Sequence, residues 1–205
     1  MYPEPIKKFI DIFSKLPSIG PRQATRLAFY LISSGKNSLT EASRAIDDLK
    51  NIKICSDCFF THSNSANICN ICMDKSRKKE IIMILEKETD LISIERTKRF
   101  TGRYLILGEL AKSGTLDSIQ KLRLSNLKNF IQKNFGALSE SSGQAEEIII
   151  ATNPTTYGDL NALIIKKELA GFAKKFSRLG RGIPAGGEIE FADEETLGQA
   201  LERRN

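Results

Sequence analysis

Four cysteines are the residues whose types and spacing most clearly predict chemistry. Cys55, Cys58, Cys69 and Cys72 form two CxxC pairs with ten residues between them, and the chain has no other cysteine. Each CxxC can place two thiolates on a tight turn, and two such turns supply the four sulfurs of a tetrahedral zinc site. Because protein sulfurs would fill every coordination position, we expect one structural Zn²⁺ per chain and not a catalytic one.

Two alternatives to zinc remain open at this point, namely four free buried thiols or two disulfides. The single histidine, His62, lies between the pairs and could replace a sulfur, although four sulfurs favour a solvated loop position for it. No signal-peptide pattern is seen at the start, and no apolar run approaches the length needed to span a membrane. We therefore expect a soluble cytoplasmic protein, and a reducing compartment favours zinc over disulfides.

Positive charge is concentrated in the first quarter of the chain. The formal net charge is +6, and residues 1–53 carry nine Lys and Arg against five Asp and Glu. This asymmetry predicts a surface for a polyanion, most simply nucleic acid. Ordinary solubility charge is the alternative.

Three helices are expected in the same region. The chain breaks at residues 16–21, and Pro21 suits the first turn of a second helix. Ser38 and Glu41 form a potential capping box for a third. Apolar residues at helical spacing predict the buried faces of the three helices, which are Ile6, Phe9, Ile10 and Phe13, then Ala24, Leu27, Ala28, Leu31 and Ile32, then Leu39, Ala42, Ile46 and Leu49.

Two helices joined by a Pro/Gly hairpin are typical of the helix-hairpin-helix DNA-binding element. The hairpin at Gly20 and the following helix start would offer unpaired N–H groups and a positive dipole end to a phosphate. Arg22 and Arg26 would contact neighbouring phosphates. Since no base edge is contacted, binding is expected to be sequence-independent and salt-sensitive. Ser18 replaces the first glycine of the usual GxG hairpin, and a hairpin that only packs is the alternative.

Beyond a basic segment at 75–79, strands and helices alternate. This alternation predicts a parallel sheet covered on both faces. The expected strands are 81–85, 104–107 and 148–151, and the expected helices are 90–96, 116–135 and 158–176. The expected buried helix positions are Ile119, Leu122, Leu127 and Ile131, then Leu160, Leu163, Ile164, Leu169 and Phe172.

Two carboxylates follow predicted strands, where α/β sheets place their sites. Glu86 follows the first strand and Asp159 the third, an arrangement similar to the Toprim site of primases and topoisomerases, in which three carboxylates hold Mg²⁺. The usual DxD reads Tyr157-Gly158-Asp159 here, so one acid is missing. A structural or partner-docking role is therefore favoured. The alternative is a Mg²⁺-dependent phosphotransferase, either a primase or a nuclease.

No phosphate-binding loop of the form GxxxxGK[ST] is present in the sequence. A Gly/Pro-rich turn at 180–187 leads into an alternating segment at 188–193, which predicts a strand ending at Asp193. This segment superficially resembles a Walker B element. Without a phosphate loop, a sheet-edge or subunit-contact strand is the favoured interpretation.

Five motifs occur in order, namely LPSIGPRQATRLAF, the double CxxC, ILEKETD, ATNPTTYGD and GIPAGGEIEFAD. Together they closely resemble the RecR recombination-mediator family of bacteria. The resemblance implies a helix-hairpin-helix domain at 1–53, a four-cysteine zinc finger at 54–79, an inactive Toprim domain at 80–176 and a Walker-B-like tail at 177–205. It also implies a non-enzymatic DNA-repair protein at the bacterial nucleoid, with no membrane or small-molecule partner.

The resemblance further implies dimers and ring-shaped tetramers that encircle DNA. Such proteins act with RecO and RecF to load RecA onto gaps coated by single-strand-binding protein. Residue by residue, Arg22 and Arg26 match DNA-contacting positions, and the four cysteines match zinc ligands. Glu86, Asp90 and Asp159 match acidic Toprim positions where a partner is expected to dock, and an acid often stands where this chain has Tyr157.

Overall fold

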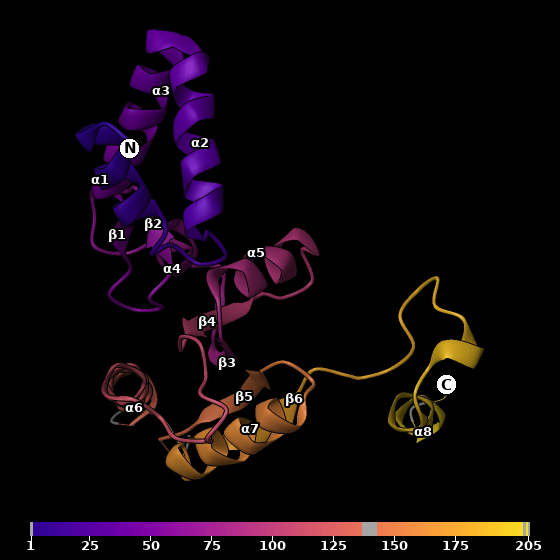
Figure 1. Cartoon of the computed structure of the whole chain (residues 1–205). Helices are drawn as coiled ribbons and strands as arrows, with labels where there is room; N and C mark the ends of the chain where they lie inside the picture. Colours follow the sequence, from indigo (N-terminus) through magenta and orange to yellow (C-terminus); the bar gives the residue numbers. More distant parts are fainter. Residues whose placement is uncertain (1, 137–142, 203, 205) are drawn as a thin grey trace. The chain divides into compact units, whose positions relative to one another are not determined.

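The structure, a computed structural model, describes residues 2–136, 143–202 and 204 (Figure 1). The chain divides into two compact units, Met1–Ile52 and Lys53–Asn205, which we call unit 1 and unit 2. No helix among the described residues combines the length and the apolar character required to cross a bilayer. The mixed α/β class is as the sequence predicts, with helices first, a cysteine module, a parallel sheet and a C-terminal helix.

Unit 1 is helical. It contains α1 (Glu4–Phe13), α2 (Pro21–Ser33), α3 (Gly35–Asp48) and a short 3₁₀ turn, η1 (Leu49–Asn51). Pro21 occupies the first position of α2, where a missing N–H removes no hydrogen bond. Ala24 and Ala28 are buried against the rest of the unit. Their small side chains allow the helices to approach closely.

Two expectations for α3 are wrong. Ser38 lies inside the helix, which begins at Gly35 after a left-handed turn (φ 89°), so no capping box forms there. Three of its expected core residues are also exposed, namely Leu39 (39%), Ile46 (55%) and Leu49 (67%). Helical spacing identifies an apolar face, but a unit of about fifty residues has too few other elements to bury that face.

Unit 2 is built on a four-stranded parallel sheet with the order β4-β3-β5-β6. Its strands are β3 (Lys78–Leu85), β4 (Gly102–Ile106), β5 (Ala145–Ala151) and β6 (Ala173–Arg178). The central β3 aligns Ile82 with Arg103 of β4 and with Ile148 of β5. Because both faces of the sheet are packed against other elements, the carboxyl-terminal half of the central β3 is buried.

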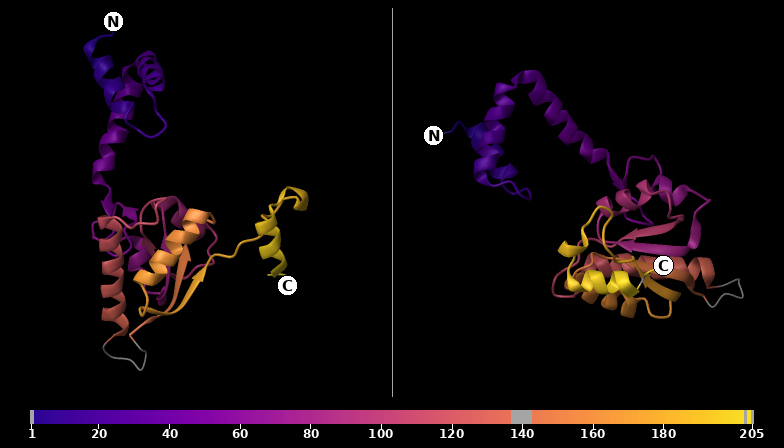
Figure 2. Two further views of the ribbon diagram at one scale, coloured as in Figure 1. Left: turned by 60° about the horizontal axis from the view of Figure 1, so that its bottom comes forward. Right: turned by 90° about the vertical axis from the view of Figure 1, so that its right-hand side faces the viewer.

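Alternate residues of β3 point to two different cores. Ile82 and Ile84 belong to the larger core, which α6 (Ser118–Phe135) and α7 (Thr156–Glu168) cover (Figure 2). Met83 and Leu85 belong to a second core, which is completed by Leu91 of α5 (Glu88–Arg96) and by Phe60 and Ile71 of the cysteine module. The cysteine module is therefore packed directly on the sheet.

The predicted helix 158–176 is wrong in its second half. Helix α7 ends at Glu168, Gly171 turns the chain at φ 85°, and the segment returns as β6. Leu169 is buried, and Phe172 packs on the same core. Both apolar side chains therefore anchor the turn that follows α7 and do not extend the helix.

The expected buried face of α6 is also only half right. Leu127 and Ile131 are buried, but Ile119 and Leu122 are exposed by 58% and 61%. The capping box between Asp117 and Gln120 fixes the start of the helix, and Gln120 then turns inward to donate to Glu109 O. In α7, Leu160 and Leu163 are likewise exposed, by 42% and 66%.

The remaining elements are short. The cysteine module contains the antiparallel pair β1 (Lys53–Ile54) and β2 (Thr61–His62) and the helix α4 (Asn70–Met73). The tail contains η2 (Ile189–Phe191) and α8 (Glu194–Glu202). The predicted strand 188–193 is therefore wrong. Within the described residues no strand pairs with this segment, and an unpaired alternating segment gains no sheet hydrogen bonds.

Candidate metal centre and nucleic-acid interface

The four cysteine sulfurs converge on one point. All four Sγ atoms lie within 4.8 Å of one another, and Cys58 Sγ is 3.5 Å from Cys69 Sγ. A tetrahedral zinc with bonds of about 2.3 Å separates its sulfurs by about 3.8 Å, so the cluster fits such an ion. All four cysteines are free, and 3.5 Å is far beyond a disulfide bond of about 2.05 Å. The disulfide alternative is therefore wrong.

Backbone hydrogen bonds shape the first knuckle. The amide of Phe59 donates to Cys55 O (3.0 Å), and the amide of Cys55 donates to Phe60 O (2.9 Å). Phe59 itself adopts a left-handed conformation (φ 63°), which closes the turn. From the second knuckle, the Cys69 amide donates to Cys55 Sγ (3.3 Å) and links the two pairs. Phe60 also covers the cluster, which buries three of the four cysteines.

The thiols influence each other's ionisation. The hydrogen bond between Cys55 and Cys58 lowers the pKa of Cys55 and raises the pKa of Cys58. Four thiolates held this close together need a cation to coexist, and a divalent metal would supply it. His62 is outside this group: it lies half-buried in β2, not in a solvated loop, and its Nδ1 accepts from the Asn64 amide (3.2 Å).

The start of α2 is open to an anion. Gly20 is its N-cap in an extended conformation, no side chain caps it, and its first turn contains no acid. Arg22 and Arg26 are exposed on the face opposite the buried alanines, and neither forms an ion pair within the part of the chain that the structure describes. Ser18 occupies the left-handed region (φ 62°), so the turn keeps the backbone that a glycine would give.

The three acids of the expected Toprim edge all have partners inside the chain. Glu86 is buried and accepts from the Asn153 amide (3.1 Å). Asp90 accepts from the Lys87 amide (3.0 Å) and caps α5. Asp159, in the first turn of α7, forms ion pairs with Arg178 and Arg181. The structure does not gather these carboxylates into one group of potential metal ligands.

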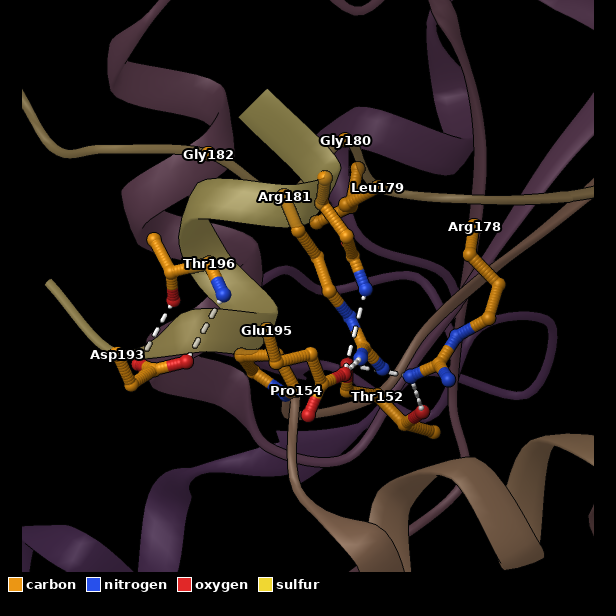
Figure 3. A pocket seen from close by; sticks show the side chains of 11 residues that line it. Thr152, Pro154, Arg178, Leu179, Gly180, Arg181, Gly182, Asp193, Glu195 and Thr196 are labelled. Atoms are coloured by element: carbon orange, nitrogen blue, oxygen red, sulfur yellow. Dashed lines mark hydrogen bonds and ion pairs between the residues drawn. The ribbon is translucent and has the colours of Figure 1, made fainter. Parts of the chain in front are cut away.

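The two arginines also line a cavity of about 370 Å³ beside the C-terminal segment (Figure 3). Arg178 Nη2 donates to Thr152 Oγ1 (2.8 Å), and Arg181 Nη1 pairs with Glu195 at 2.9 Å (Figure 3). Burial, with a contribution from the Arg181 charge, lowers the pKa of Arg178. Arg181 thus connects Asp159 of α7 to Glu195 of α8. Neither arginine belongs to a recognisable motif, because each meets Asp159 only through the fold.

Asp193 has a structural task. Its carboxylate accepts from the Thr196 amide and from the Thr196 hydroxyl, both at 2.8 Å (Figure 3). The backbone hydrogen bond lowers the pKa of Asp193. The Walker-B-like aspartate therefore caps the first turn of α8 and does not end a strand.

Comparison with protein-family models gives three matches. The RecR helix-hairpin-helix model matches residues 6–49, a Toprim model matches residues 80–180, and the RecR C-terminal model matches residues 182–205. Two RecR-specific models thus flank the Toprim match in the expected order. The chain belongs to the RecR family. RecR proteins are recombination mediators, and the Toprim domain is a part of their architecture. This confirms the recombination role predicted from the motifs, and nothing here favours the primase or nuclease alternative.

Proposed function

We propose that this RecR-family chain is a zinc-containing DNA clamp and adaptor. It binds DNA without sequence preference and, with RecO and RecF, promotes RecA loading onto gapped DNA coated by single-strand-binding protein. The observation that carries the DNA contact is the uncapped, acid-free start of α2 with exposed Arg22 and Arg26 beside it. A backbone phosphate is the ligand that fits such a helix start.

The domain assignment follows the family. We propose a helix-hairpin-helix domain at 1–53, a zinc finger at 54–79, a Toprim domain from residue 80 and a C-terminal segment after it. Because β6 continues to Arg178, the domain boundary expected at 176 is better drawn after that strand. Cys55, Cys58, Cys69 and Cys72 are the proposed ligands of one structural Zn²⁺, which would hold the two knuckles against the sheet.

Oligomerisation would multiply a weak contact. One α2 start offers a few phosphate contacts, so one protomer should bind DNA weakly. A dimer or a ring-shaped tetramer would repeat that contact along the same DNA and slow its escape. The exposed Leu39 and Ile46 of α3, with Leu49 at the start of η1, support self-association, since an apolar face of this kind needs a cover.

The acids of the Toprim edge are proposed partner contacts. A basic surface of RecO or RecF would reach Asp90 and Asp159 most directly, because Glu86 is buried. Docking at Asp159 requires competition with Arg178 and Arg181, which already hold it. Partner affinity at this edge should therefore depend on ionic strength.

A RecA-loading assay tests the proposal. Gapped DNA coated with single-strand-binding protein is mixed with RecO, RecF, RecA and either the natural chain or the Arg22→Ala, Arg26→Ala variant. We expect the natural chain to accelerate RecA filament formation and the variant to lose that effect. Lys121→Ala with Lys133→Ala removes the same charge from exposed positions on α6 and is the control. Equal loading by both variants would contradict the proposed DNA contact.

A further inference from the structure

The amino-terminal edge of the sheet has two halves, and they differ in whether their positive side chains are paired with acids. At the starts of β5 and β6, Lys174 pairs with Glu146 (2.6 Å) and Lys175 pairs with Glu147 (3.0 Å). Each lysine there has an acid on the neighbouring strand. The pKa of Glu147 is lowered, chiefly by a hydrogen bond from Ser177 and further by the contact with Lys175. The charge of this half is therefore balanced within the chain.

The other half, at the starts of β3 and β4, is not balanced. Six exposed cations belong to the chain segments of this half and form no ion pair with any described residue, and we call them the basic edge: Lys75, Lys78, Lys79, Arg96, Lys98 and Arg99. Nearby acids are already engaged, since Asp74 accepts from Ser76 and Glu95 pairs with Arg77. Glu80 is the one neighbouring acid without a described partner, so a large positive excess remains.

A partly buried network holds the two segments of the basic edge together. Arg77 pairs with Glu95 at the end of α5 (2.5 Å) and donates to Gly102 O at the start of β4 (3.0 Å). Tyr104 also donates to Glu95 (2.6 Å), and the Lys78 amide donates to Thr101 O (2.9 Å). The cations on residues 75–79 and 96–99 are thus presented from backbone segments tied to one another. A pre-organised cluster loses little entropy when it binds an anion.

Helix capping explains only part of the cluster. Arg96, Lys98 and Arg99 lie at the carboxyl end of α5, where the helix dipole favours positive charge. Lys98 even adopts a left-handed conformation (φ 55°), which glycine would adopt without strain. The dipole does not account for Lys78 and Lys79, which belong to β3. Like charges brought together in this way repel one another unless an external anion screens them.

We propose that the basic edge is a second binding surface for the nucleic-acid backbone, separate from the start of α2. The proposal rests on the proposed function in that the ligand is DNA. Lysine-rich, exposed and without a capping acid, the surface suits a row of phosphates. The nearest aromatic ring, Phe100, is half-buried against Tyr104 with 4.9 Å between ring centroids, so base stacking is not expected. Contacts to phosphate alone carry no sequence preference.

Salt titration of DNA binding by the full-length chain tests this surface. The test variant changes Lys78, Lys79, Lys98 and Arg99 to Gln. The control variant changes four exposed cations on α6 and α7 to Gln, namely Lys121, Lys133, Lys166 and Lys167, which also have no ion pair among the described residues. Fluorescence anisotropy with labelled DNA gives log K against log salt for each protein. Losing four phosphate contacts should reduce the slope by about 3 per protomer, whereas the control should retain the natural slope.

The outcomes separate the two proposals. Equal slopes for the test and control variants, with DNA binding still lost on Arg22→Ala and Arg26→Ala, overturn the basic edge and leave the proposed function standing. A natural chain that binds no DNA overturns both. If the four-residue variant is unstable, Lys78→Gln with Lys79→Gln, both exposed on β3, gives the same test with an expected slope change of about 1.5.

Discussion

Replacing Asp159 by Asn should detach the C-terminal segment from α7. Asp159 forms ion pairs with Arg178 and Arg181, and Arg181 also forms an ion pair with Glu195 of α8. The substitution keeps the size of the side chain but removes its charge, so two guanidinium groups lose their shared partner. The C-terminal segment then keeps the Arg181–Glu195 pair but loses its anchor on α7.

The size of the effect follows from exposure. The Asp159 side chain is 42% exposed, and those of Arg178 and Arg181 are 29% and 21% exposed. Partly exposed pairs of this kind contribute about 0.5–1 kcal/mol each, which gives a loss of about 1–2 kcal/mol in the free energy of unfolding. For a chain of this size the melting temperature should fall by about 2–8 °C.

Thermal unfolding and limited trypsin digestion measure this directly. Trypsin should cleave after Arg181 faster in the Asp159→Asn variant than in the natural chain, because the segment that contains this arginine is no longer held to α7. Glu195→Gln is the matched control, since Glu195 is 70% exposed and its single pair should contribute less than about 0.5 kcal/mol. Identical melting and cleavage in the two variants would refute the idea that Asp159 anchors the segment.

Three further predictions concern the metal, the tail and the acidic edge. Elemental analysis should find one zinc per chain, and Cys58→Ala or chelation should abolish it and lower the melting temperature; a metal-free chain of equal stability would contradict this. Because the Asp193 pKa lies below its usual 3.8, the cap adds stability above the unfolded-state pKa, and this is lost as pH falls through the lower folded value. The Thr196 amide resonance should report that transition, and an unchanged signal in strong acid would exclude the cap. Gly158→Ala should lower the free energy of unfolding by about 1–3 kcal/mol, since the added Cβ would lie 1.9 Å from Asn153 O; unaltered denaturant unfolding would show that this contact can relax.

Sequence reasoning succeeds where a pattern is local and chemically specific. The spacing of four cysteines predicts a cluster, and the sulfurs do lie within 4.8 Å of one another. Three short apolar segments predict the parallel strands β3, β4 and β5, and the predicted bounds agree with the observed ones within a few residues. In both cases the information is contained in neighbouring residues.

The failures occur where distant partners decide the structure. Residues 188–193 alternate like a strand, yet they form η2 because no described strand pairs with them. The end of α7 is fixed by Gly171, whereas the apolar spacing of Leu169 and Phe172 suggests a longer helix. The two arginines that hold Asp159 follow it by about twenty residues, and only the fold brings them to α7. The exposure of the apolar face of α3 cannot be predicted either, since helical periodicity does not show whether another element covers that face.

The central claim is that Arg22 and Arg26, at the open start of α2, bind the DNA backbone. The most direct measurement is the slope of log K against log salt for the natural chain and for the Arg22→Ala, Arg26→Ala variant, on several unrelated DNA sequences. The account predicts weaker binding of the variant by the same factor on every sequence, with a slope reduced by about 1.5–2 per protomer. An unchanged slope, or a loss confined to some sequences, would contradict it.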